Sequence, residues 1–249
     1  MIYQFILFQF IAHLLADFIF QPHGWTLSKS SKIISWHHIY HVIVVFLFSW
    51  LLSFDFSFWK AALMLTLLHF ITDVLKSYLQ IKSRKLKEQK NYFFADQFVH
   101  LIILVSISII YYLNYELKPF YELPLNHTLI LASFIFCAKP ANIIIKNIFI
   151  AFSIETPHPN SYENSNKAVN EEITLPNAGK LIGIMERFLV LSLVLIGQYS
   201  AVGLIIAAKS ILRYKSTQKN EYILVGTLLS FGIAVLLGIL ISNAFIHTI

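Results

Sequence analysis

The sequence predicts an all-α protein of the membrane, a polytopic helix bundle with about eight transmembrane segments. Hydrophobic residues make up 57% of the 249 residues and charged residues only 13%, a balance that would force a water-soluble protein to expose far too much apolar surface. The apolar residues also run in stretches of membrane-spanning length. Short polar or proline-containing links separate these stretches, and several links are rich in Lys and Arg.

The first four segments look like two hairpins with polar residues in matching places. Segment one ends where Pro22 stops the helix. It lacks a basic start and a small-residue cleavage site, so we expect a retained helix and not a signal peptide. A polar linker precedes segment two, and a strongly basic loop follows segment three. The four segments cover about residues 2–20, 36–54, 58–79 and 92–113.

The second half of the chain is less regular. Segment five is interrupted by Lys139-Pro140, which predicts a kink or two half-helices. The polar stretch 155–177 predicts a mobile loop or a joint between domains. Segment seven is short and follows segment six closely, so these two are either spans or a re-entrant pair. The segments cover about residues 127–152, 181–198, 201–214 and 222–246.

These segments suggest three parts: a four-helix metal-binding module at 1–115, a variable helix with a polar cytoplasmic loop at 116–180, and C-terminal membrane helices at 181–249. Orientation follows from the basic residues after segment three, because Lys and Arg in short loops mark the cytoplasmic side. The N-terminus is then outside. The basic residues are Lys76, Lys82, Arg84, Lys85, Lys87 and Lys90.

The orientation of the protein in the membrane also explains the net charge of +6 better than binding to nucleic acid does. No platform of alternating aromatic and basic residues, of the kind that single strands need, is visible outside the predicted spans. The basic loop is instead suited to contact anionic lipid. Cys137 is the only cysteine, which excludes an intrachain disulfide and a thiolate metal site.

Four pairs of ionisable residues lie inside the apolar stretches, the two members of each pair three or four residues apart. This spacing puts both members on one face of a helix. Ionisable groups are costly within a membrane, so they mark a functional site by default. The pairs are His13 and Asp17, His38 and His41, His69 and Asp73, and Asp96 and His100.

All four pairs are predicted at one depth, because they fall late in the segments that run inward and early in those that run outward. An antiparallel bundle can project such pairs into one interior site in the cytoplasmic half of the membrane. Imidazole and carboxylate together suit zinc, manganese or ferrous iron, as one or two ions. Such a centre would activate water for hydrolysis of a phosphate ester or lipid-linked substrate. Asp17, Asp73 and Asp96 are the candidate catalytic carboxylates.

Other interpretations stay open. A His/Asp pair in a membrane can be only an interhelical hydrogen bond, and the same groups can serve a proton or ion pathway in a transporter. A third alternative is a signalling scaffold whose polar stretch 155–177 recruits a cytosolic partner. His37 lies beside His38 and points elsewhere. The remaining histidines fall outside the predicted cluster: His23, His127, His158 and His247.

A second group of charges is predicted on the same side of the membrane, near the ends of segments six and seven. Basic side chains there could hold an anionic substrate such as a phosphate or a lipid head group. Lys and Arg at helix ends also commonly extend toward the membrane surface without binding anything. The candidate substrate-binding residues are Glu186, Arg187, Lys209 and Arg213.

Several motifs resemble a family of bacterial multi-pass membrane proteins of unknown function. In the N-terminal half these are His13-Leu-Leu-Ala-Asp17-Phe, His37-His38-Ile-Tyr-His41, His69-Phe-Ile-Thr-Asp73 and Asp96-Gln-Phe-Val-His100. The C-terminal runs 179–187, 207–213 and 221–227 resemble the longer members of that family. The repeated His-x-x-x-Asp pattern is also similar to bacterial inner-membrane proteins labelled metal-dependent hydrolases. This similarity implies metal ligands near the cytoplasmic leaflet of the inner membrane.

Overall fold

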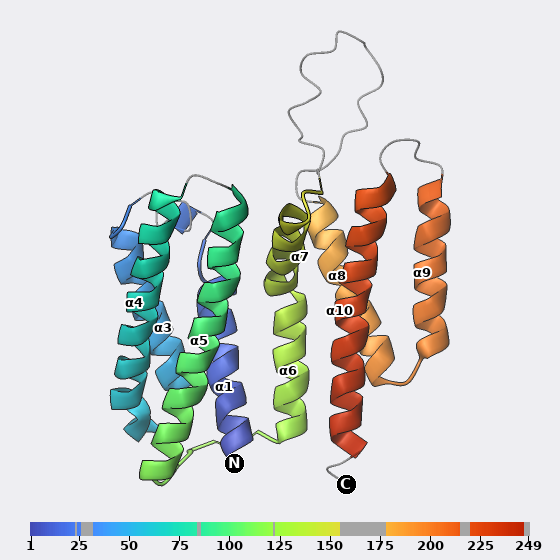
Figure 1. Cartoon of the computed structure of the whole chain (residues 1–249). Coiled ribbons are helices and arrows are strands. Elements are labelled where there is room, and N and C mark those ends of the chain that lie inside the picture. Colours follow the sequence, from blue (N-terminus) through green and yellow to red (C-terminus); the bar gives the residue numbers. More distant parts are fainter. Residues whose placement is uncertain are drawn as a thin grey trace. The chain divides into compact units, whose positions relative to one another are not determined.

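The computed structural model describes residues 1–22, 24–25, 32–83, 86–121, 123–154, 178–214 and 220–246. Over these ranges the chain is all-α, with nine α-helices and no strand, as the sequence predicts. The chain divides into two compact units, Met1–Phe136 and Cys137–Ile249, whose helices are drawn in Figure 1. The predicted role of 155–177 as a loop falls outside the described residues.

Helices α1, α3, α4 and α5 form a closed ring in the N-terminal unit, because α3 packs on α1 and α4, and α5 packs on α4 and α1. α1 continues directly into η1, a single π-helical turn. Helix α6 follows in the same unit. The elements are α1 (Ile2–Leu14), η1 (Leu15–Ile19), α3 (Trp36–Leu51), α4 (Trp59–Lys82), α5 (Leu86–Asn114) and α6 (Leu125–Cys137).

A buried aspartate closes one end of this bundle. Asp55 lies in the α3–α4 link, just before the short 3-10 turn η2 (Phe56–Phe58). Its carboxylate accepts hydrogen bonds from the backbone N–H of Ser57 at 2.9 Å, the hydroxyl of Tyr111 at 3.1 Å and the backbone N–H of Lys118 at 3.2 Å. Three donors compensate the buried charge, so Asp55 ties η2, α5 and the chain after α5 together.

The helices around the basic residues are longer than predicted. α4 ends at Lys82 and α5 begins at Leu86, so only residues 83–85 separate them. Four of the six basic residues predicted in one loop therefore lie on helices, two on α4 and two on α5. The physical reason is that Lys is a good helix former, so both helices extend beyond their apolar stretches. Lys76 lies well inside α4 and belongs to the bundle interior.

Helix α4 shows that the bundle is polar inside and apolar outside. Its exposed face carries Leu63, Leu67, Ile71 and Leu75, each about half exposed. Its opposite face buries Thr66, His69, Asp73 and Ser77. A soluble helix has the reverse arrangement, and an apolar surface of this kind is suited to lipid.

Four helical stretches are long and apolar enough to cross a membrane: Ile2–Ile19, Phe56–Lys82, Asn91–Asn114 and Leu224–Ala244. A fifth is formed by α6 and α7 if this broken pair counts as one span. Two shorter apolar helices are Trp36–Leu51 and Tyr199–Ile211. These four to five candidates indicate a multi-pass membrane protein. Each of the eight predicted segments contains a helix, with segment five divided into two.

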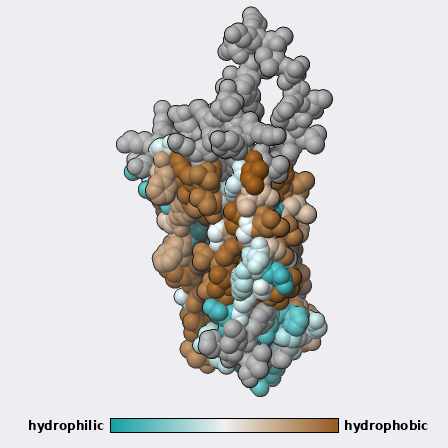
Figure 2. Space-filling model, turned by 90° about the vertical axis from the view of Figure 1, so that its right-hand side faces the viewer, coloured by the Kyte–Doolittle hydropathy of each residue, from teal (hydrophilic) through white to brown (hydrophobic). Residues whose placement is uncertain are grey.

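The C-terminal unit contains α7 (Lys139–Ala151), α8 (Ala178–Leu195), α9 (Tyr199–Tyr214) and α10 (Asn220–Ile246). The predicted interruption at Lys139-Pro140 is confirmed, since α6 ends at Cys137 and α7 begins at Lys139. α8 packs along α10. Figure 2 looks onto the side that carries α9, where hydrophobic side chains predominate and hydrophilic ones gather toward the lower end.

Candidate metal centre

The π-helical turn at the end of α1 positions the first carboxylate. The backbone N–H of Phe20 donates to the carbonyl of Leu15 at 2.8 Å, five residues earlier in the chain. Such π-turns are rare and frequently occur at functional sites. Asp17 lies in this turn, and its Oδ1 is 3.6 Å from Nδ1 of His13, which lies in the last turn of α1.

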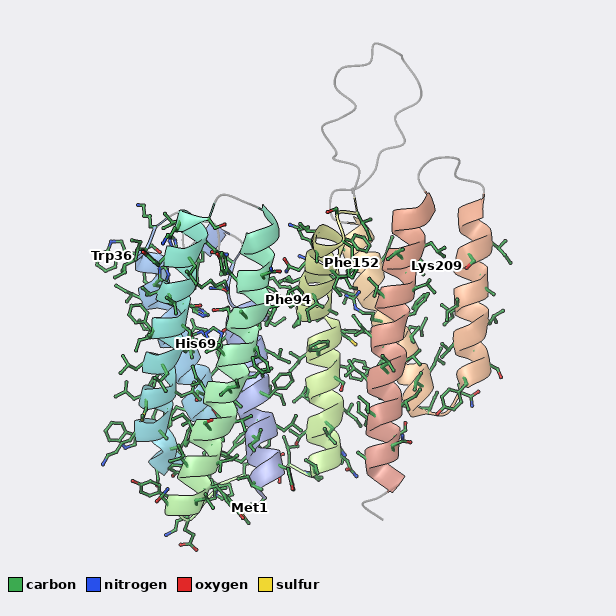
Figure 3. The ribbon with its side chains drawn as sticks, viewed as in Figure 1. Met1, Trp36, His69, Phe94, Phe152 and Lys209 are labelled. Carbon is green, nitrogen blue, oxygen red and sulfur yellow. The ribbon has the colours of Figure 1, made fainter. Side chains whose placement is uncertain are left out.

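The other three ring helices contribute the remaining members of the cluster from their inner faces. α3 contributes His41, α4 contributes His69 and Asp73, and α5 contributes Asp96 and His100, all of them buried. Figure 3 shows His69 pointing into the N-terminal bundle, whereas Trp36 projects away from it. The predicted convergence of four helices on one interior site is therefore present in the structure.

Three groups of ligand atoms lie close enough together to hold a metal ion, with all atoms of a group within 4.8 Å of one another. Seven of the eight predicted ligands belong to at least one group, and His69, Asp73 and His100 each belong to two. The groups are His13, Asp17, His69 and His100; His41, His69 and Asp73; and Asp73, Asp96 and His100.

Spacings at the middle of the cluster match those of ligands around one ion. His41 Nε2 is 3.1 Å from His69 Nε2, and each of these atoms is 3.5 Å from Oδ1 of Asp17. On the other side, Asp73 Oδ2 is 3.6 Å from His41 Nε2 and 3.9 Å from His69 Nε2. Metal–ligand bonds of about 2.0–2.2 Å place neighbouring ligand atoms roughly 3–3.6 Å apart. The residues present therefore fit a divalent ion.

The hydrogen bonds of His100 prepare one of its nitrogens for metal binding. The hydroxyl of Thr72 donates to the carbonyl of His69 at 2.7 Å, so it accepts from Nε2–H of His100 at 2.6 Å. Nδ1 of the neutral ring then carries a lone pair. This atom has no hydrogen-bond partner and lies 3.8 Å from a carboxylate oxygen of both Asp17 and Asp96. Three acceptors that face one another favour a cation between them, and Thr72 sets the tautomer that allows it.

His38 is the one predicted ligand that lies outside these groups. Its Nδ1 accepts from the backbone N–H of Ser35 at 3.1 Å, which caps the start of α3, and its Nε2 lies 3.1 Å from the hydroxyl of Ser77. Both ring nitrogens thus have partners away from the cluster. This arrangement gives His38 a structural role, because it joins the N-terminus of α3 to α4.

Lys76 is a member of the site that sequence reasoning placed in the basic loop. Its Nζ donates to Oδ2 of Asp96 at 2.7 Å, and its side chain is only 22% exposed. The amide of Gln97 donates to the same oxygen at 3.1 Å. Lys76 follows Asp73 by three residues on α4, so helical spacing was the signal that could have assigned it to the inner face.

A cavity of about 20 Å³ adjoins the cluster on the side away from Lys76. Its lining includes three imidazoles of the cluster together with Gln9 and Ser49. The hydroxyl of Ser49 donates to Oε1 of Gln9 at 2.6 Å, and Nε2 of Gln9 donates to the carbonyl of Ser49 at 3.0 Å. A cavity of this volume has room for about one water molecule, which would stand beside the imidazoles.

Arg187 is enclosed within the C-terminal unit, whereas a substrate-binding side chain would be expected at an accessible surface. It is 1% exposed, and it donates to the carbonyls of Cys137 at 2.6 Å and Ala138 at 3.1 Å, to Asn142 Oδ1 at 2.7 Å and to Ser230 Oγ at 3.0 Å. The two carbonyls lie at the break between α6 and α7, where a helix end leaves acceptors without intrahelical donors. Arg187 therefore stabilises this break, and four of its five N–H donors are already used.

The other three predicted substrate-binding residues do not gather into an anion site among the described side chains. Lys209 donates to the carboxylate of Glu186, which joins α9 to α8. Arg213 lies in the last turn of α9, and its side chain is outside the described part of the structure. Substrate binding by this group stays a prediction.

Comparison with known proteins identifies the family and nothing finer. No curated protein and no solved structure matches the chain. A family described as "Protein of unknown function (DUF3307)" matches residues 5–130, a range that contains all eight predicted ligands. The C-terminal part of the predicted resemblance lies outside this match. Because the match covers half of its length, the chain belongs to this family of unknown function.

Proposed function

We propose that the N-terminal unit is a membrane-embedded divalent-metal hydrolase that acts on the phosphate ester of a lipid-linked substrate. The observation that carries this proposal is the gathering of seven His and Asp side chains from four helices, six of them buried, with ligand atoms 3.1–3.9 Å apart at its middle. Purely structural polar packing needs no such concentration of carboxylates, which are costly inside a membrane.

The donor set determines the chemistry that the centre supports. Imidazole nitrogen and carboxylate oxygen suit zinc, manganese or ferrous iron. A bound divalent ion polarises a phosphoryl oxygen and lowers the pKa of a coordinated water to about 7. In hydrolysis, the oxygen of a water molecule would form a bond to phosphorus while the ester P–O bond breaks, and the leaving alkoxide would take a proton from solvent. A carboxylate of Asp17, Asp73 or Asp96 takes the proton of the water, as a general base.

A groove in the N-terminal unit favours a lipid-linked substrate over a soluble one. Apolar side chains of α1, α5 and α6 line an open groove of about 300 Å³. Leu104 lines both this groove and the small cavity beside His13, His69 and His100. On α1 the groove runs from Phe10 back toward Tyr3. An acyl chain lying there would have its head group at the His/Asp cluster.

The same proposal includes the location of the protein. We place it in the bacterial cytoplasmic membrane as a multi-pass protein with about eight spans and the N-terminus outside. The basic residues near the facing ends of α4 and α5 support this orientation. The cluster lies toward that end of the bundle, so a phosphate-containing substrate would reach it from the cytoplasmic leaflet.

Metal content tests the centre directly. We expect the detergent-purified chain to retain at least one divalent ion per molecule in elemental analysis, and Asp17→Asn to lower that content strongly. Asp55→Asn is the matched control, because Asp55 is a buried carboxylate of the same unit that accepts its hydrogen bonds outside the cluster. Absence of any divalent ion from the wild-type protein would refute the proposal.

Substrate choice is tested by phosphate release. We expect activity on phosphatidic acid in mixed micelles to exceed that on the soluble ester p-nitrophenyl phosphate. Leu129→Trp should fill the groove and raise the KM for phosphatidic acid without changing metal content. Leu131→Trp on the exposed face of the same helix is the control. If both variants lose activity on phosphatidic acid equally, the groove does not bind the substrate. If a metal-loaded protein hydrolyses neither ester, the proposed hydrolase activity is refuted.

One observation favours a transporter as a second candidate. Buried polar residues continue beyond the cluster toward the other end of the bundle, first Gln9 with Ser49 and then Ser53 with Asp55. A polar interior of this kind is found along ion pathways. Entry of Zn²⁺ or Mn²⁺ into vesicles that contain the wild-type protein, and its loss in Asp17→Asn, would favour transport over hydrolysis.

A further inference from the structure

The cluster contains one positively charged side chain that the proposed chemistry does not use. Lys76 lies on α4 one turn beyond Asp73, and its Nζ contacts Oδ2 of Asp96 at 2.7 Å. The side chain of Asp96 is 3% exposed and that of Lys76 is 22% exposed. The ammonium group thus contacts one member of the third ligand group, which comprises Asp73, Asp96 and His100.

The charges of the cluster favour one ion over two. Three carboxylates, those of Asp17, Asp73 and Asp96, contribute three negative charges, and the ammonium of Lys76 removes one. The two remaining negative charges equal the charge of one divalent ion, with the histidines as neutral ligands. A second divalent ion would leave an excess of two positive charges inside the bundle, where charge is poorly solvated.

The cluster also has two parts in space, one around Asp17, His41 and His69 and the other around Asp96 and Lys76. The tightest spacings join Asp17, His41 and His69, between 3.1 and 3.5 Å, whereas the ammonium of Lys76 pairs with Asp96 at 2.7 Å. Asp96 offers Oδ2 to Lys76, while its Oδ1 is buried without a hydrogen-bond partner. One half of the cluster is therefore arranged for an external cation, and the other half already holds an internal one.

We propose that Lys76 is a built-in cation that neutralises Asp96 in the third ligand group and limits the centre to one divalent ion, held by Asp17, His41, His69 and His100. This inference rests on the proposed metal centre and specifies its stoichiometry. Removal of the ammonium makes Asp96, together with Asp73, available to a second ion. Lys76 is thus a positioning residue that acts through Asp96.

The test is the number of ions per chain. The full-length wild-type protein, Lys76→Met and Lys82→Met are equilibrated with excess Zn²⁺ in detergent, separated from free metal and analysed for zinc. We expect one ion in the wild type, close to two in Lys76→Met, and one in Lys82→Met. Lys82 is the matched control because it lies in the last turn of the same helix and is exposed.

The outcomes separate the two proposals. No zinc in any protein refutes the metal centre itself. One ion in both the wild type and Lys76→Met leaves the centre standing and overturns the role of Lys76, as do two ions in the wild type. A measurement on the wild type alone covers the case in which Lys76→Met does not fold. Loaded with excess Mn²⁺, it should give the electron paramagnetic resonance spectrum of an isolated ion, and the spectrum of an exchange-coupled pair would overturn the inference.

Discussion

Thr72→Val should weaken metal binding although Thr72 is not itself a ligand. The substitution keeps the shape of the side chain but removes the oxygen that accepts from Nε2–H of His100 at 2.6 Å. The ring must then leave a buried N–H without an acceptor, at a cost of about 1–3 kcal/mol, or move its proton to Nδ1, which ends the ability of that atom to bind metal. Loss of such a partner lowers metal affinity about 10–100-fold.

The assay is competition for Zn²⁺ between the purified protein and a chelator of known affinity. Thr66→Val provides the control, since Thr66 lies on the same helix, is buried, and has a hydroxyl without a hydrogen-bond partner. We expect Thr66→Val to bind Zn²⁺ like the wild type. If Thr72→Val retains wild-type affinity, or if both variants lose affinity equally, the assignment of the His100 tautomer is wrong.

Two further predictions concern the C-terminal unit. Arg187→Met should lower the free energy of unfolding by about 2–6 kcal/mol, because the two carbonyls at the α6–α7 break each lose a donor; thermal unfolding in detergent should show a much smaller effect for Lys209→Met, whose ion pair is partly exposed. Gly238→Ala should destabilise by about 1–3 kcal/mol, because its new Cβ would lie 2.5 Å from Cγ1 of Val194. Gly232→Ala, which meets nothing within 4 Å, should be neutral or slightly stabilising in the same assay, and an equal effect of both substitutions would contradict the close packing of α8 on α10.

The fold class and the boundaries of most segments could be predicted because they depend on local sequence. Apolar length determines which stretches can lie in a membrane, and Pro140 marks the break that separates α6 from α7. The predicted segment boundaries were wrong where the chain is basic. α4 and α5 extend as helices on either side of residues 83–85, beyond their apolar stretches. The length of an apolar stretch cannot predict such an extension, because Lys also favours helix in water.

The candidate ligands could also be predicted, because ionisable residues stand out against apolar sequence and helical spacing assigns them to one face. The sequence could not predict which of these candidates share a site. His38 and His41 are indistinguishable by type and spacing, yet the capping interaction with Ser35 and the contact with Ser77 take both nitrogens of His38. The π-turn that carries Asp17 has no signal in hydrophobic periodicity, because it inserts one residue into a continuous helix.

By itself, the sequence determined that this chain is a helical membrane protein with paired His and Asp residues at one depth, since burial cost and periodicity act along a single helix. Only the tertiary structure decided that seven of these residues meet, that Lys76 lies among them, and that Arg187 stabilises a helix break. These outcomes depend on which faces of different helices oppose one another. Atoms far apart in the chain determine them, through distances of about 3 Å that no local pattern encodes.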